Sequence, residues 1–383
     1  MDKTMDKEKV KKVDTFKSGR FAFSWNYSSE AILELQVRSR ILDQTIVDLP
    51  ILPGLASQLE EEVIRRSIFA TAAIEGNPLT EEQVGEILEL FPVGNLPSEE
   101  KSEREISNLR AAYRVFDEAE IMEDPRITEI RIRQIHEQIT YGKENPEKIP
   151  GKYRSHIVKV GTRDHGGIYT PPKIYDDIRP LMEEFVRWIN SIHVMELDPV
   201  IRGALAHYHL ALIHPFGNGN GRTARLIEAL IMRGAGIWYA PLMLSNYYYK
   251  NIDEYFLAFS RSRRNKNKDV TPFLEFVLRG LCESLEEIKG GRTHVIRLFT
   301  MRDYFASLRE GREITQRQHD LLGILLDYLV PFTLNDLYSK PLFRLLYRSV
   351  SERTARRDLH KLESMNILTK KNGKYLLNLR ALG

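Results

Sequence analysis

A glycine-rich loop at residues 214–222 has the residue types needed to hold a polyphosphate beside a base. Gly217, Gly219 and Gly221 allow tight turns, so that backbone N–H groups can approach a ligand closely. These N–H groups lead into the N-terminus of the next expected helix, where an anion is favoured. His214 stands at the start of the loop and offers an imidazole. This combination predicts phosphoryl or nucleotidyl transfer.

Two arginines after the loop add positive charge to this site. Arg222 and Arg225 are three residues apart and share one side of the first helical turn. Each guanidinium can donate two parallel hydrogen bonds to phosphate oxygens. The alternative interpretation is a turn between helices with two solvated arginines and a terminal histidine. We favour the site because the functional residue types fill one short window, and because GxxxxGK[ST] and the kinase HRD and DFG motifs do not occur.

Helices are expected on both sides of the loop, and the fold class predicted from apolar spacing is mostly α. Asp198-Pro199 supplies an N-cap and a first-turn proline for a helix that runs to about Ile213. The helix after the loop starts near Arg222 and ends at Gly234-Ala235-Gly236. A β-hairpin with a mobile tip is predicted earlier in the chain, where two β-prone runs flank residues 161–167.

An apolar helix at about 55–76 carries an acidic residue near its end. Thr71 and Glu75 are four apart and lie on one helix face, just before Gly76 ends the helix. A carboxylate that faces inward needs a cationic partner, because a buried unpaired charge is costly. The alternative is a solvated glutamate before the end of the helix. Thr80 and Gln83 predict a capping box for the next helix.

The segment His214-Pro-Phe-Gly-Asn-Gly-Asn-Gly-Arg-Thr-Ala-Arg225 resembles the HPFx(D/E)GNGRxxR signature of the Fic (Fic/Doc) family, whose characteristic activity is protein AMPylation. The resemblance extends from about residue 20 to about residue 280, and Gly151-Lys-Tyr-Arg154 also fits the family pattern. It implies a Fic-type helical bundle with a small β-hairpin flap. It also implies that His214 is the general base and that ATP is the donor. The ATP-binding residues implied are Phe216, Gly217, Asn218, Gly219, Asn220, Gly221, Arg222 and Arg225, with Tyr255 and Phe256 as weaker candidates for the adenine pocket.

The resemblance implies a flap and a brake as well. The flap residues Val158, Lys159, Val160, Ile168 and Tyr169 would pair with the backbone of the target protein. Thr71, Glu75 and Gly76 match the inhibitory pattern (S/T)xxxE(G/N). In this interpretation Glu75 and the γ-phosphate compete for Arg225.

Asn218 departs from the family signature, which has Asp or Glu at this position as the protein ligand of Mg²⁺. An asparagine oxygen carries no charge, and protein-bound Mg²⁺ is normally held by carboxylates and phosphates. Mg²⁺ is therefore expected to be held mainly by ATP. The substitution also leaves the donor open, because some Fic relatives transfer UMP, phosphocholine or phosphate.

The C-terminal part of the chain has its own charge pattern. Residues 348–383 contain nine Lys or Arg and three Asp or Glu, whereas the whole chain has a net charge of +3. Helices are expected at Gln316–Tyr328, Leu334–Ser339 and Ser351–Met365, followed by a hairpin around Asn372-Gly373. This order is that of a winged helix-turn-helix, with Gly290-Gly291 as its linker. Residues 351–377 would bind DNA, or the module would dock on a protein.

The bulk composition is that of a globular protein with a substantial core. The chain of 383 residues is 42% hydrophobic and 28% charged. No run approaches the length of a membrane span, no signal peptide is evident, and the single Cys282 cannot form an internal disulfide. We expect a cytoplasmic protein, with the oligomeric state left open and a homo-oligomer possible.

The interpretation that combines these features is a self-inhibited protein adenylyltransferase acting on a tyrosine, serine or threonine hydroxyl. Its expected parts are an N-terminal region at 1–105, a catalytic core at 106–289 and a winged-helix domain at 292–383. The alternative is a DNA-binding transcriptional regulator in which the Fic core senses a nucleotide. The intact His214 favours the enzyme, because a sensor has no need of a base.

Overall fold

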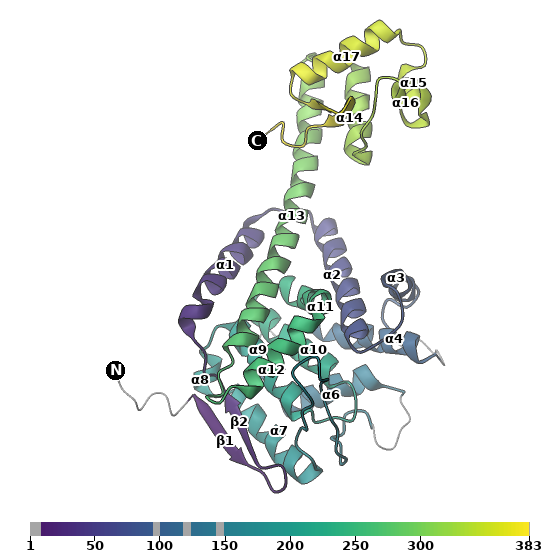
Figure 1. Cartoon of the computed structure of the whole chain (residues 1–383). Coiled ribbons are helices and arrows are strands. Elements are labelled where there is room, and N and C mark those ends of the chain that lie inside the picture. Colours follow the sequence, from purple (N-terminus) through teal and green to yellow (C-terminus); the bar gives the residue numbers. More distant parts are fainter. Residues whose placement is uncertain (1–8, 95–99, 118–123, 143–148, 383) are drawn as a thin grey trace. The chain divides into compact units, whose positions relative to one another are not determined.

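The computed structural model describes residues 9–94, 100–117, 124–142 and 149–382 and is mostly helical (Figure 1). The chain divides into two compact units, one made of Met1–Asp48 and Leu52–Lys289 and the other of Leu49–Ile51 and Gly290–Gly383. Each unit has its own hydrophobic core. Over the described ranges, no helix has both the length and the apolar character needed to cross a bilayer.

The first unit is a helical bundle built around one pair of central helices. Its helices are α1 (Ser29–Asp48), α2 (Pro53–Ile74), α3 (Glu81–Leu90), α4 (Lys101–Tyr113), η2 (Arg114–Asp117), α6 (Glu129–Thr140), α7 (Tyr175–Ile189), α8 (Ile192–Met195), α9 (Pro199–Ile213), α10 (Asn220–Gly234), α11 (Ala240–Lys250) and α12 (Ile252–Arg264). Helix α9 packs against α10, and α2 packs against α11. Helix α9 is buried almost all round, as its near-continuous apolar sequence requires.

Local sequence signals explain where the helices around the loop begin and end. Asp198 caps α9 by accepting a hydrogen bond from the N–H of Val200, with Pro199 in the first turn, as predicted. Thr80 and Gln83 form the predicted capping box of α3. Helix α2 ends at Ile74 because Gly76 adopts a positive φ of 84°.

The N-terminal region contains a hairpin that the sequence analysis did not predict. Strand β1 (Val10–Asp14) pairs antiparallel with β2 (Arg20–Ser24). The turn between them is held by Asp177 of α7, which accepts hydrogen bonds from the N–H groups of Phe16 and Lys17. Alternation of polar and apolar residues over five positions is a weak signal, and lysines at the edge weaken it further.

The predicted flap hairpin is reduced to a single antiparallel bridge. Val160 and Tyr169 exchange both backbone hydrogen bonds, at 2.8 and 2.7 Å, but their neighbours form no strand. Extending this register by two residues would bring Pro171 opposite Val158, and proline has no N–H to donate. The ladder therefore stops at the bridge.

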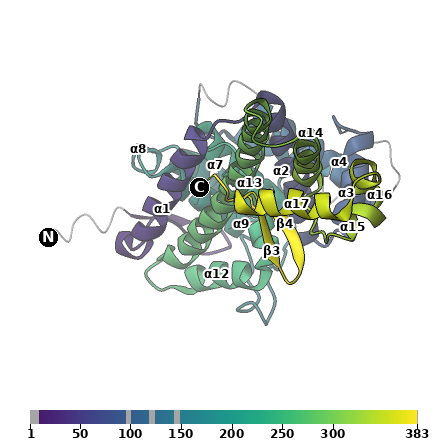
Figure 2. The same ribbon diagram turned by 90° about the horizontal axis from the view of Figure 1, so that it is seen from above.

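The second unit contains four helices and a hairpin after the end of a long helix. These elements are α13 (Thr271–Glu310, shared by both units), α14 (Gln316–Tyr328), α15 (Asp336–Ser339), α16 (Pro341–Tyr347), α17 (Glu352–Ser364), β3 (Leu368–Lys371) and β4 (Lys374–Leu377). The turn residues Asn372 and Gly373 both have positive φ, as the predicted tight hairpin requires. Helix α17 lies beside this hairpin (Figures 1 and 2).

Two details of the second unit differ from the sequence prediction. Gly290-Gly291 lies where the two units divide, as predicted, but both glycines are inside the continuous helix α13 and do not form a loop. Glycine costs a helix only about 1 kcal/mol relative to alanine, and helix-forming residues on both sides outweigh that cost. In addition, Phe332 pairs with Tyr375 of β4 and so adds a third chain segment to the hairpin.

Candidate active site

A cavity of about 420 Å³ opens where the flap, α9, the start of α10 and α12 meet the end of α2. Nine of the predicted site residues line it: Glu75, Lys159, Val160, Tyr169, His214, Gly221, Arg225, Tyr255 and Phe256. The structure thus brings together residues from five separate segments of the chain. Thr71, Gly76, Val158, Ile168 and the loop residues 216–220, together with Arg222, do not line the cavity.

His214 is held at the cavity by its backbone. It ends α9 in the left-handed conformation, with φ 50°. The buried Arg154 fixes this turn: its Nε donates to the carbonyl of His214 at 2.8 Å, and its own N–H donates to the carbonyl of Pro215 at 2.9 Å. The same guanidinium donates to the carbonyl of Pro172 beyond the flap. Arg154 therefore ties the loop to the base of the flap.

The rest of the loop is braced from within and from α6. Asn220 clamps Phe216 by accepting from its N–H at 2.9 Å and donating to its carbonyl at 2.8 Å. Phe216 is fully buried and stacks on His136, with ring centroids 3.6 Å apart. Nε2 of His136 also lies 2.9 Å from the carbonyl oxygen of Asn218. These contacts give Phe216 and Asn220 a role in fixing the loop conformation.

Glu75 and Thr71 both contact the guanidinium of Arg225. Nη2 of Arg225 lies 2.9 Å from Oε1 of Glu75, and Nε donates to Oγ1 of Thr71 at 2.8 Å. Arg225 is only 4% exposed, so its charge is compensated by this contact inside the protein. Burial raises the pKa of the Glu75 carboxyl, but the charges of Arg225 and Arg222 outweigh that effect and lower it. Glu75 is therefore ionised at neutral pH.

The carboxylate of Glu75 lies directly over the N-terminus of α10. A Cβ atom added to Gly221 would collide with Oε1 of Glu75 and approach Nη1 of Arg225 to 3.1 Å. The N-terminal turn of a helix is a favourable place for an anion. Glu75 thus occupies the position that the sequence analysis assigned to a phosphate group.

The pKa of His214 is lowered to about 4, first by burial and then by the nearby charge of Arg154. The imidazole is therefore neutral at physiological pH and can accept a proton. Its Nδ1 lies 3.3 Å from the carbonyl oxygen of Ala211.

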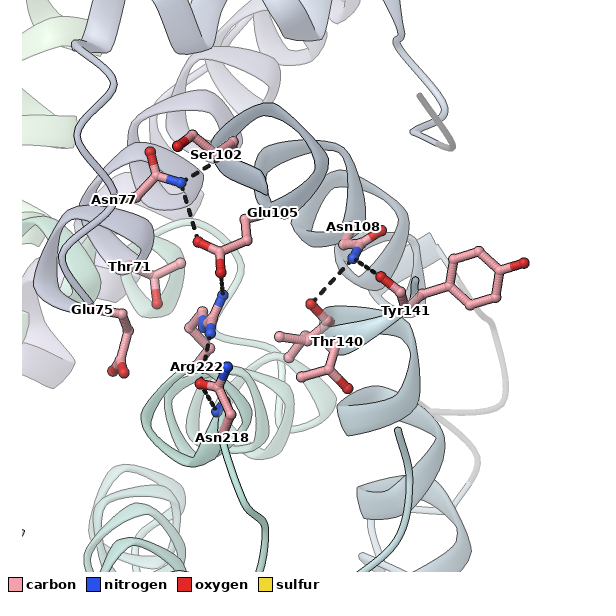
Figure 3. Close-up of polar contacts among 12 residues, drawn as sticks. Thr71, Glu75, Asn77, Ser102, Glu105, Asn108, Thr140, Tyr141, Asn218 and Arg222 are labelled. Atoms are coloured by element: carbon pink, nitrogen blue, oxygen red, sulfur yellow. Dashed lines mark hydrogen bonds and ion pairs between the residues drawn. The ribbon is translucent and has the colours of Figure 1, made fainter. Parts of the chain in front are cut away.

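Arg222 lies in a second polar cluster, in which it faces Glu105 of α4 (Figure 3). Its Nη1 is 3.6 Å from Oε1 of Glu105, which comes from α4. Glu105 in turn accepts a hydrogen bond from Nδ2 of Asn77 at 3.2 Å, and Asn77 follows α2 by three residues. Nη2 of Arg222 donates to Oδ1 of Asn218 at 3.2 Å. Among the described residues, Nε and Nη1 of Arg222 have no hydrogen-bond partner, although the side chain is buried.

The aromatic candidates Tyr255 and Phe256 line the cavity from α12. The hydroxyl of Tyr255 is 2.9 Å from Nε2 of His207 and 3.4 Å from Nη1 of Arg225, and its ring stacks on Tyr248. His207 is fully buried, and its Nδ1 lies 2.9 Å from the Glu228 carboxylate. His207 is thus a hydrogen-bonded core residue.

Arg154 was noted in the sequence without a role, whereas Glu105 and His136 were missed altogether. Both missed residues lie far from the loop in sequence, on α4 and α6, so the signature around residue 214 could not indicate them. His136 lies among the inward isoleucines of α6, where a polar residue signals a buried partner, whereas α4 also buries Ser107 and Asn108 and so does not single out Glu105. That signal does not identify the partner.

Comparison with known proteins agrees with this geometry. The sequence profile of the Fic/DOC family matches residues 126–232. These residues form a Fic/DOC domain. The Fic/DOC domain holds α6, the flap, α9, the loop and most of α10, and the inhibitory candidate Glu75 lies upstream of it.

Named relatives extend the similarity beyond the Fic/DOC domain. Protein adenylyltransferase Fic of Drosophila erecta is 33% identical over 224 residues, which are 57% of this chain and 40% of the relative. The protein of the same name in Drosophila melanogaster is 32% identical over 230 residues, or 58% of this chain and 42% of the relative. The chain therefore spans about two fifths of the length of these relatives.

Solved structures share the fold. A Fic family protein from Desulfovibrio desulfuricans G20 has a TM-score of 0.56 at 21% identity and covers 91% of this chain and 96% of its own. Fic-1 (residues 134–508) from C. elegans has a TM-score of 0.55 at 25% identity, over 69% of this chain and 74% of its own. The mostly helical Fic fold with small hairpins is thus confirmed.

Proposed function

We propose that this chain is a self-inhibited protein adenylyltransferase, which moves AMP from ATP to a tyrosine, serine or threonine hydroxyl of a target protein. The observation that carries the proposal is the position of Glu75. Its carboxylate contacts Arg225 and covers Gly221 in the cavity that also contains His214. An anion at a helix N-terminus beside a neutral imidazole marks the place of a phosphate chain next to a base. The names of the Drosophila relatives support adenylyl transfer.

The reaction that this arrangement supports is an in-line displacement at phosphorus. The neutral imidazole of His214 accepts the proton of the target hydroxyl. The hydroxyl oxygen then bonds to the α-phosphorus of ATP, the bond from that phosphorus to the bridging oxygen breaks, and pyrophosphate leaves. Charge that develops on the phosphates is stabilised by backbone N–H groups at the start of α10, and by Arg222 and Arg225.

Glu75 acts as a brake in this proposal because it competes with the γ-phosphate for Arg225. A charge-assisted hydrogen bond contributes about 1.5–3 kcal/mol. ATP can bind productively only after this contact is broken. Thr71 keeps Arg225 in reach of Glu75 through a separate hydrogen bond, and Gly76 ends α2 at the point where the carboxylate meets the guanidinium.

The flap is the part of the site that we assign to the target protein. Ile168 and Ile157 are 58% and 60% exposed, and the Val160–Tyr169 bridge leaves the neighbouring residues outside any strand. An extended segment of the target can pair with such a backbone as an added strand. Pairing would present its hydroxyl to His214, since Val160 and Tyr169 line the same cavity.

The residues present do not fit a Mg²⁺ ion held by the protein. Oδ1 of Asn218 is uncharged and already accepts from the N–H of Gly219 at 2.6 Å and from Arg222. No cluster of three metal-ligating side chains occurs in the part of the chain that the structure describes. We therefore propose that Mg²⁺ enters with ATP, held by its phosphates.

Incubation with labelled donors tests the proposed reaction. The full chain is mixed with a cell lysate and α-labelled ATP, with labelled UTP and CDP-choline as competing donors. Label on protein from ATP alone is the expected result, and His214→Ala should abolish it while ATP binding persists. A positioned general base contributes roughly 10²–10⁴-fold. Label from another donor would revise the substrate, and undiminished labelling by His214→Ala would overturn the role of the base.

A second candidate function is DNA binding by a winged-helix module at 292–383. It is supported by the distribution of charged residues on α17. The buried face of α17 contains Asp358, which pairs with Arg317 at 2.8 Å. The exposed residues include Arg353, Arg356, Arg357 and Lys361, and the hairpin adds the exposed Lys370, Lys371 and Lys374. Of the acidic residues of α17, Asp358 is buried, whereas Glu352 and Glu363 are exposed and Glu352 pairs with Arg356 at 2.5 Å. The exposed basic side chains outnumber these two carboxylates and are suited to phosphate contacts.

Gel retardation of duplex DNA by the full chain tests this module. Binding should weaken by roughly 0.9 log units per contacted phosphate for each tenfold rise in salt. Arg356→Ala combined with Arg357→Ala should weaken it further, whereas His214→Ala should leave it unchanged. The absence of retardation at low salt would favour a protein-docking role instead.

A further inference from the structure

A second cavity of about 230 Å³ borders the candidate active site. It is lined in part by β2, by Arg263 in the last turn of α12, and by Lys268 and Val270 after that helix. Tyr169, Leu212 and Arg263 line both cavities, so these three residues form a shared wall. The hydroxyl of Tyr169 donates to the carbonyl of Leu212 at 3.2 Å, which holds the flap against α9 at that wall.

The second cavity is positively charged. Arg20, Arg263 and Lys268 line it, and none of the described lining residues is an aspartate or a glutamate. Arg20 pairs with Asp14 at 2.7 Å on the exposed β1–β2 hairpin. Arg263 lies over the ring of Tyr169, 5.0 Å from its centroid, and neither Arg263 nor Lys268 forms an ion pair with a described residue. Two cations at this cavity are thus available to a ligand.

His209 adds an unused polar group to the same cavity. The residue is only 1% exposed, and its Nε2 lies 3.1 Å from the backbone nitrogen and 2.9 Å from the backbone oxygen of Ser24. Its Nδ1 has no hydrogen-bond partner within the described ranges. Burial lowers the pKa of His209 to about 4, so the ring is neutral. When Nε2 accepts from Ser24, the proton lies on Nδ1, and a buried donor without an acceptor is costly.

We infer that this cavity, the anion pocket, binds an acidic side chain of the target protein whose hydroxyl faces His214. The inference rests on the proposed function. Unpaired cations are suited to a carboxylate, and Nδ1 of His209 adds a buried donor in the tautomer in which Nε2 accepts from Ser24. The shared wall of Tyr169 and Leu212 places the pocket next to the flap, where the target backbone is proposed to pair. A target is therefore selected by an aspartate or glutamate close to the modified residue.

Direct binding can be measured without any transfer reaction. The full chain, labelled with ¹⁵N-histidine, is titrated with N-acetyl-glutamate amide and, as a matched neutral probe, with N-acetyl-glutamine amide. The imidazole signal of His209 should shift with the glutamate probe only. Lys268→Asn should reduce that shift, since it removes one cation while asparagine tolerates the positive φ of 56° at this position. Equal responses to both probes, or a response to inorganic phosphate alone, would overturn the inference.

Peptide labelling then tests the role in target selection. Glu75→Gly enzyme is given pairs of hydroxyl-containing peptides that differ only by glutamate or glutamine near the hydroxyl. The glutamate peptide should have a KM about tenfold lower, the effect of one charge-assisted hydrogen bond. Lys268→Asn should remove this advantage without changing kcat for the glutamine peptide. The control Lys266→Asn alters an exposed neighbour that does not line the pocket and should preserve the advantage.

The two experiments fail in different ways. If no peptide is labelled from any donor, the proposed transferase activity is wrong, and the histidine titration still decides whether the pocket binds a carboxylate. If peptides are labelled but glutamate gives no advantage at any tested position, the acidic-target inference is wrong and the transferase activity stands.

Discussion

At the scale of single residues, the site is defined by buried charges that are neutralised in pairs. Arg225 is held by Glu75 and Thr71, and Arg222 faces Glu105. Buried cations of this kind are stable only with a nearby anion. In the proposed function, the negative charges of ATP replace that of Glu75 at Arg225.

The low pKa of His214 predicts an unusual pH profile. His214 must be unprotonated to act as a base. With a pKa of about 4 it is unprotonated across the neutral range, and activity should fall only as the pH drops through that value. In Glu75→Gly enzyme, loss of the negative charge near His214 should lower this pKa further. The measurement is kcat/KM for AMP transfer from ATP as a function of pH, with folding checked by circular dichroism. An acidic limb near the ordinary histidine value of about 6.5 would contradict the buried environment.

Because the side chain of Asn218 is uncharged, we predict that it contributes little to Mg²⁺ binding. Asn218→Asp adds the charged oxygen that the loop lacks and should lower the Mg²⁺ concentration needed for half-maximal transfer. The change is nearly isosteric, so the hydrogen bonds to Gly219 and Arg222 are retained. The test is a Mg²⁺ titration of both proteins at fixed ATP. Superimposable curves would show that the metal does not approach this side chain.

At the scale of elements, the site depends on helices that approach the loop from distant parts of the chain. Helix α2 brings Glu75 to one side of α10, and α4 brings Glu105 to another. Asn77 connects the two, since it follows α2 and donates to both the Ser102 carbonyl and the Glu105 carboxylate. The end of α2 is therefore fastened to α4 just beyond the inhibitory glutamate.

Removal of the Glu105 charge should lower the stability of the protein, and bound ATP should restore part of that stability. Glu105→Ala leaves Arg222 buried without an anion, which costs on the order of 3 kcal/mol. Glu105→Gln keeps an acceptor for Asn77 and loses only the charge. Both variants should have a lower Tm, and ATP should raise the Tm of each by more than it raises that of the wild type. Unchanged Tm values without ATP would show that the Glu105–Arg222 pair contributes nothing.

At the scale of the whole molecule, local signals predicted the fold more fully than the site. The ends of α9 follow from Asp198-Pro199 and the glycine-rich loop, and the β3–β4 turn follows from Asn372-Gly373. Gly290-Gly291 indicated where the units divide, but the same dipeptide suits a loop and, at modest cost, a helix, so it did not show that α13 continues there. The local sequence does not show whether a helix continues through a pair of glycines.

The remaining parts of the site were not predictable because they are long-range contacts. His136 meets Phe216 from eighty residues away, and Arg154 reaches His214 from sixty. The anion pocket joins Arg20 of the N-terminal hairpin to Lys268, which are even further apart. Only the folded chain brings such residues together. The prediction of phosphoryl or nucleotidyl transfer, in contrast, rests on the charge and spacing of the loop residues, which are local properties.

The central claim is that Glu75 restrains an adenylyltransferase by holding Arg225. The most direct measurement compares protein labelling from α-labelled ATP by wild type, Glu75→Gly, and Glu75→Gly combined with Arg225→Ala. Release of one charge-assisted hydrogen bond should raise labelling by Glu75→Gly about ten- to a hundredfold over wild type. The double variant should return to background, because Arg225 is then missing from the phosphate site. Labelling by Glu75→Gly no higher than that of wild type would contradict the account.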